Sequence, residues 1–150
     1  MRNKQVRLYN VLFPLWFLMI FPVTWLIVLP GNFLIDSRVL IVTLRVLKIT
    51  DKMAWYKRYI LKIFGFGMLA DVIGAAFLFL MMILEVYDIR NELLLTIPAM
   101  LVSAALIFVF NYFVTFRREE KAIRLRLALT FAIVTAPYTF LVPSGWLYGF

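Results

Sequence analysis

Long apolar runs separated by short charged segments dominate the sequence. Four of these runs reach or approach the roughly 17 to 25 residues that a helix needs to cross a bilayer core, and they begin near residues 11, 60, 93 and 127. The segments between them are too short to form a separate domain with its own core. We therefore predict an all-α fold, a polytopic integral membrane helical bundle that forms a single domain over residues 1–150.

Lysine and arginine gather in three of the segments that separate the apolar runs. They lie before the first run, between residues 51 and 62, and between residues 117 and 126, whereas residues 85–92 carry three acidic residues and one arginine. Because positively charged flanks stay on the cytoplasmic side during insertion, we predict that the basic segments are cytoplasmic and the acidic segment is outside. The N-terminus is then cytoplasmic and the C-terminus is outside.

Residues 32–50 must also cross the membrane for this distribution to hold, although four charged residues interrupt them. Without that crossing, both later basic segments would face the side opposite the basic N-terminus, and the acidic segment would be cytoplasmic. An alternative that preserves the same sides is a re-entrant hairpin of residues 9–50 that turns at Pro30-Gly31. We predict about five transmembrane helices, at residues 9–29, 32–50, 60–84, 94–116 and 127–146.

Composition agrees with a membrane protein and excludes several chemistries. Apolar residues make up 65% of the chain, whereas soluble domains contain about 45 to 50%. Cysteine and histidine are absent, which excludes thiol chemistry and metal ligation by these residues. The net charge of +8 is spread over several segments, which argues against nucleic acid as a partner. No catalytic motif is found, and we expect neither an enzyme nor a cofactor or metal site.

Asp71 is the most informative polar residue because it lies near the middle of the span 60–84. Gly67 and Gly74 lie close to it along the helix, at spacings that let another helix approach closely. Counted at about 1.5 Å per residue, Asp71 comes within about one helical turn of Arg45 on the preceding span. We predict a buried ion pair between Asp71 and Arg45. Its role stays open between a structural pair that fixes helix register, a site coupled to protons or ions, and a carboxyl group that stays protonated or faces a subunit interface.

Other polar residues in the predicted spans are further candidates for the buried site. Asp36 and Arg38 belong to residues 32–50, on different sides of that helix, and Asn111 lies toward the cytoplasmic end of its span. A membrane asparagine is typical of hydrogen bonding between helices, but Asn111 also falls near the level of Arg45. Pro137 removes a main-chain hydrogen bond from the last span, so we predict a kink there.

Two classes of function remain compatible with these residues. The first is a small transporter or channel component with a buried polar site near mid-membrane. The second is a non-catalytic accessory or scaffold protein that docks other membrane proteins or anionic lipid. In either class we expect a multi-pass protein of the cell membrane with anionic lipids at its cytoplasmic face. Because a few short spans make a thin wall around a pathway, we also expect a homo-oligomer or a membrane-protein partner.

Overall fold

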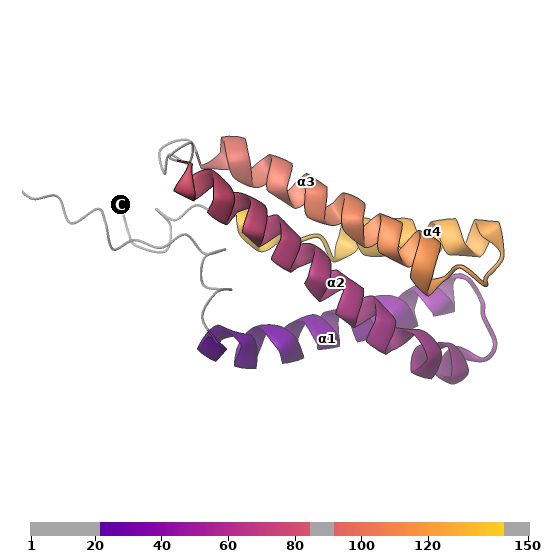
Figure 1. The fold of residues 1–150 in the computed structure, drawn as a ribbon. Helices are drawn as coiled ribbons and strands as arrows, with labels where there is room; N and C mark the ends of the chain where they lie inside the picture. Colours follow the sequence, from indigo (N-terminus) through magenta and orange to yellow (C-terminus); the bar gives the residue numbers. More distant parts are fainter. Residues whose placement is uncertain (1–21, 85–91, 143–150) are drawn as a thin grey trace, which may run out of the picture.

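The computed structural model describes residues 22–84 and 92–142 of the chain. These residues form four α-helices, a short π-helical segment and a short 3-10 helix, and no strand is found among them. Each α-helix runs back along the one before it (Figure 1). The elements are α1 (Pro22–Val46), α2 (Lys52–Ile83), α3 (Leu93–Phe110), η4 (Asn111–Thr115), α4 (Lys121–Val134) and η5 (Tyr138–Leu141).

Four helical segments of the described part are long and apolar enough to cross a membrane. Many large apolar side chains lie on their outer surface, and Leu26 and Ile27, for example, are 76% and 77% exposed. A soluble bundle rarely exposes so much contiguous apolar surface, so these helices indicate an integral membrane protein. The predicted all-α bundle is confirmed for the described residues, and its helices are long and apolar enough to cross a membrane. The candidate spans are Pro22–Val46, Lys52–Ile83, Leu93–Thr115 and Lys121–Leu141.

Helix α1 continues through Pro30 and Gly31, where we predicted a turn between two spans. A proline removes one main-chain hydrogen bond, and membrane helices tolerate that loss because leaving the helix would expose more unpaired backbone to hydrocarbon. The predicted boundary between spans 9–29 and 32–50 is therefore wrong, as is a hairpin broken at that point. Residues 1–21 lie outside the described part, and neither the five-span count nor the predicted sides of the termini is confirmed.

The turn between α1 and α2 is fixed by main-chain bonds at the end of α1. Lys48 adopts a left-handed conformation with a φ of 56°. Its N–H donates to the Arg45 carbonyl at 3.1 Å, and the Ile49 N–H donates to the Leu44 carbonyl at 3.1 Å. This pair of bonds is the Schellman motif, which usually has glycine at the position of Lys48. The chain therefore reverses within a few residues.

Two apolar clusters hold the helices together. The larger cluster includes Leu44 of α1, Ile63 of α2 and Phe131 of α4, all fully or almost fully buried. The smaller cluster includes Leu78 of α2 and Phe140 of η5. Helix α2 contributes to both clusters and packs against α1 and α3, so it forms the centre of the bundle. Asp71 lies between the α2 positions that serve the two clusters.

Both described basic segments lie at the same end of the bundle. The α1–α2 turn and the α3–α4 turn are neighbours there (Figure 1). Tyr59 of α2 donates a hydrogen bond to Glu119 in the α3–α4 turn. The guanidinium carbon of Arg124 lies 4.2 Å from the centroid of the Tyr112 ring, and Arg124 also donates to the Tyr112 hydroxyl at 3.0 Å. Side-chain contacts therefore tie the α3–α4 turn to α2 and tie α4 to η4.

Candidate functional site

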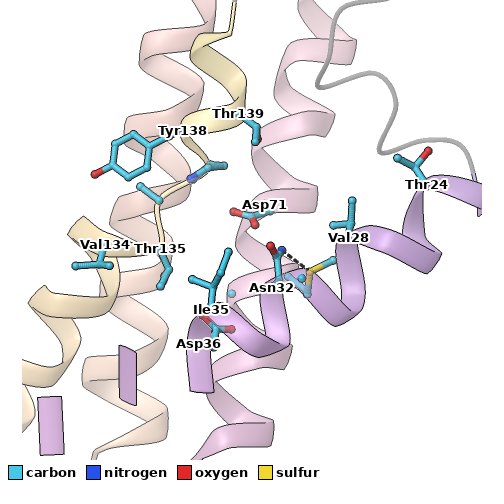
Figure 2. A pocket seen from close by; sticks show the side chains of 15 residues that line it. Thr24, Val28, Asn32, Ile35, Asp36, Asp71, Val134, Thr135, Tyr138 and Thr139 are labelled. Carbon is cyan, nitrogen blue, oxygen red and sulfur yellow. Dashed lines mark hydrogen bonds between the residues drawn. The ribbon is translucent and has the colours of Figure 1, made fainter. Parts of the chain in front are cut away.

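A cavity of about 410 Å³ lies between α1, α2 and the segment that joins α4 to η5. Figure 2 shows its lining, with Asp71 of α2 between Asn32 of α1 and the segment that carries Thr135 and Thr139. Part of the lining, including Thr139, is exposed, so the cavity reaches the surface of the described residues. Its size falls within the range of about 300 to 1,000 Å³ that is usual for small-ligand sites.

Two carboxyl groups from different helices face this cavity. Asp36 of α1 and Asp71 of α2 both belong to its lining, and only 6% and 7% of their surfaces are exposed. No lysine or arginine of the described residues lines the cavity with them. Burying two carboxylates without a counter-charge is costly. Each carboxyl group is therefore stabilised either by taking up a proton or by a cation in the cavity.

One carboxyl oxygen of Asp71 lacks a hydrogen-bond partner among the described residues. This oxygen, Oδ1, is buried. The large majority of buried polar side-chain atoms have at least one partner, and a carboxylate oxygen has two lone pairs to satisfy. Oδ1 of Asp71 is therefore an unsatisfied acceptor in a residue of the cavity wall.

Gly67 and Asn32 set the positions of groups on α1 and α2. The Asp36 carboxyl lies beside α2 at Gly67, where an added Cβ would be 3.8 Å from Asp36 Oδ2, an ordinary contact distance. Asn32 precedes Asp36 by one turn and lies on the same face of α1. Its Nδ2 donates to Met68 Sδ at 3.1 Å. This bond holds the amide at the cavity wall (Figure 2).

The third wall of the cavity is a break in the last candidate span. Helix α4 ends at Val134, residues 135–137 are not helical, and η5 begins at Tyr138. Pro137 has no N–H to donate to the Ile133 carbonyl, and the Tyr138 hydroxyl donates to that carbonyl instead. Where we predicted a kink at Pro137, the helix is interrupted. The end of α4 therefore presents carbonyl groups that lack their helical donors.

The predicted ion pair between Asp71 and Arg45 is not formed. Arg45 lies in the last turn of α1 and is exposed, whereas Asp36, nine residues earlier, reaches the cavity. Nine residues of helix span about 13.5 Å. The prediction placed Arg45 near the middle of a span at 32–50, but α1 ends at Val46, so Arg45 lies at the end of its helix.

The other predicted site residues lie outside the cavity. Arg38 is exposed on α1. Asn111 is fully buried in η4, where its Nδ2 donates to the Ile107 carbonyl at 2.9 Å, and its Oδ1 has no partner among the described residues. Gly74 is buried and packs closely against Ser103 of α3. The small face at Gly74 therefore serves packing within the chain.

The sequence analysis did not predict that Asn32, Thr135 and Thr139 share one site with the two carboxyl groups. The spacing of these residues was a usable signal. Asn32 and Asp36 are four residues apart, and so are Thr135 and Thr139 on either side of Pro137. The pattern could not show that these two stripes meet, because their meeting depends on how α1, α2 and the end of α4 pack.

Comparison with known proteins assigns no family to this chain. No protein-family model, curated protein or solved structure matches it. Among the described residues, no group of three or more acidic side chains is gathered closely enough to hold a metal ion. The protein is therefore defined by its fold and its site, as a helical bundle with candidate membrane spans and an acidic cavity inside it.

Proposed function

We propose that this protein is a small membrane transporter or channel component, and that the cavity between Asp36 and Asp71 is the polar site on its pathway. The unpaired, buried Asp71 carboxyl in a cavity between candidate membrane-spanning helices is the observation that carries this proposal. Ionisable groups are costly at membrane depth and usually mark a path for ions or substrates there. A register-fixing ion pair would require a basic partner, and none of the described residues provides one at the cavity wall.

The break between α4 and η5 gives the proposal independent support. Non-helical backbone at membrane depth is tolerated only where protein covers it or where it lines a water-filled cavity. Residues 135–137 line the same cavity as the two carboxyl groups. Discontinuous helices of this kind form the substrate and ion sites of many secondary transporters.

We infer that the end of the bundle with the two basic turns faces the cytoplasm, where lysine and arginine are retained during insertion. The anionic lipids of the cytoplasmic leaflet would attract these residues. The α1 residues of the cavity, from Thr24 to Asp36, belong to the part of that helix farthest from the basic turn. The cavity would then lie in the outer half of the membrane.

The direct test measures ion flux into liposomes that contain the purified full chain. Gradients of protons, sodium, potassium, magnesium and calcium are applied one at a time to liposomes that carry the wild type, Asp71→Asn or Asp51→Asn. Asp51 is exposed at the start of α2 and its side chain caps no helix, so Asp51→Asn removes the same charge outside the cavity. We expect flux of at least one ion that Asp71→Asn loses and Asp51→Asn keeps.

Two results would contradict the transport proposal. One is flux no greater than in empty liposomes for every ion of the panel. The other is equal flux through the wild type and Asp71→Asn, with both proteins shown to be folded by gel filtration and tryptophan fluorescence.

Arg38 favours a second candidate function, the docking of a membrane-protein partner. Arg38 is exposed on α1 beside exposed apolar side chains such as Leu34 and Val42. A full charge on the outer face of a membrane helix is costly unless protein or water covers it. A second copy of this chain is the partner to test first. Cross-linking in liposomes should capture a dimer of the wild type and less of Arg38→Leu, and equal yields would argue against this surface.

A further inference from the structure

Residues with oxygen-bearing side chains line the cavity on α1, α2 and the segment after α4. Asp36 and Asp71 supply carboxylate oxygens from α1 and α2. The Nδ2 of Asn32 is engaged by a methionine sulfur, which leaves its Oδ1 as an acceptor. The Thr135 hydroxyl donates to the Phe131 carbonyl at 2.8 Å, so its lone pairs are the part left for a ligand. Carboxylate, amide and hydroxyl oxygens are the hard donors that alkali and alkaline-earth cations prefer.

The broken end of α4 adds negative potential at the same place. The C-terminus of a helix carries a partial charge of about −0.5 from the aligned peptide dipoles. The carbonyl oxygens of Val134 and Thr135 accept no main-chain hydrogen bond from the described residues, and both residues line the cavity. Unwound carbonyls and helix C-termini coordinate cations in membrane transporters. The two carboxyl groups and the end of α4 therefore both favour a cation.

We propose that this cavity binds a hard metal cation, with Asp36 and Asp71 as its charged ligands and with Asn32, Thr135 and the end of α4 as its neutral ones. The inference deepens the proposed function and rests on it for the role of the ion in transport. It goes beyond the sequence, which indicated no metal site. A proton would satisfy a single carboxyl oxygen and leaves the convergence of the neutral oxygens unexplained. Two carboxylates balance two positive charges, so the test compares monovalent with divalent ions.

Equilibrium binding to the purified full chain tests the proposal. The chain is placed in nanodiscs of uncharged lipid, and radioactive sodium, rubidium as the tracer for potassium, and calcium are titrated in turn, with magnesium as a competitor. We expect saturable binding of one of these ions. Asp71→Asn and Asp36→Asn should each weaken it by at least about tenfold, since even indirect ligand partners have effects of that size. Asp71→Glu should retain binding, and Asp51→Asn should leave it unchanged.

A second measurement leaves both carboxyl groups in place and stays informative if an aspartate variant does not fold. The chain has no native cysteine, so Thr139→Cys creates a single thiol at the exposed edge of the cavity. A saturating concentration of the bound cation should slow alkylation of this thiol. Thr50→Cys, in the exposed α1–α2 turn, should react at the same rate with and without the cation.

The outcomes separate the cation site from the transport proposal. The cation site is overturned if none of the three titrated ions binds saturably, if Asp71→Asn and Asp36→Asn bind as tightly as the wild type, or if the cation leaves Thr139→Cys alkylation unchanged. Flux that depends on Asp71 without any cation binding would leave transport standing and remove the cation site. Cation binding without flux would leave the cation site standing and remove the transport proposal.

Discussion

Replacement of Gly74 by alanine tests how closely α2 packs against α3. A Cβ added at Gly74 would collide with the Ser103 hydroxyl, and it would lie 3.0 Å from a ring carbon of Phe140 and 3.4 Å from the Ala99 carbonyl oxygen. Ser103 is fully buried and donates to the Ala70 carbonyl at 3.1 Å. The new methyl group therefore forces the serine to move and breaks the bond between the two helices.

The size of the effect follows from three contributions. Overpacking of a tight contact costs about 1 to 3 kcal/mol, and loss of the Ser103 hydrogen bond costs about 1 kcal/mol. Alanine in place of glycine inside a helix returns about 1 kcal/mol. We therefore expect Gly74→Ala to lower the free energy of unfolding by about 1 to 3 kcal/mol.

Gly65→Ala is the matched control on the same helix. No atom lies within 4 Å of a Cβ added there, and Gly65 is exposed. This variant should therefore gain up to about 1 kcal/mol from helix propensity alone. Unfolding of both variants and the wild type is measured in detergent micelles by titration with a denaturing detergent, with circular dichroism as the signal.

A double variant checks that Ser103 is the cause. Ser103→Ala alone loses the hydrogen bond, but in combination with Gly74→Ala it also removes the hydroxyl that collides with the new methyl group. The double variant should therefore be more stable than the sum of the single effects by about 0.5 to 3 kcal/mol. If Gly74→Ala is as stable as Gly65→Ala within about 0.5 kcal/mol, the α2–α3 contact is not as tight as the structure shows.

Three further predictions concern the basic end of the bundle. Lys48→Gly should stabilise the protein by about 1 kcal/mol in the same unfolding assay, because Lys48 holds a left-handed conformation that glycine adopts without steric cost; destabilisation would contradict the Schellman turn. Tyr59→Phe should destabilise it by about 0.5 to 1.5 kcal/mol through loss of the bond to Glu119, and an unchanged free energy of unfolding would show that this bond contributes nothing. Single cysteines at Thr50 and Glu120, both exposed in the turns, should react with an impermeant reagent from the same side of the membrane; reaction from opposite sides would overturn the arrangement of the spans.

The sequence alone determined the class of this protein and the identity of its most unusual residue. Apolar runs of sufficient length predict membrane helices because the cost of transfer into hydrocarbon depends on the composition of each segment by itself. Asp71 stood out for the same reason, since a carboxyl group inside an apolar run is costly wherever its helix packs. Both conclusions depend on local composition, and the structure retains a helical bundle with Asp71 buried in it.

The continuity of α1 was missed because Pro30-Gly31 is a turn signal in water, where a broken helix can bond to solvent. In hydrocarbon the backbone gains more by staying helical, and α1 passes through both residues. With one continuous helix in place of two spans, Asp36 and not Arg45 lies at the cavity with Asp71.

Only the tertiary structure decided what surrounds Asp71. The sequence favoured Arg45 as its partner, whereas the packing of α1, α2 and the broken end of α4 places Asp36 and a set of neutral oxygens at the same cavity. Helical periodicity shows which residues share a face of one helix, but it does not show which faces meet. That choice depends on crossing angles and close contacts such as Gly67 against Asp36, which arise only when all the helices pack together.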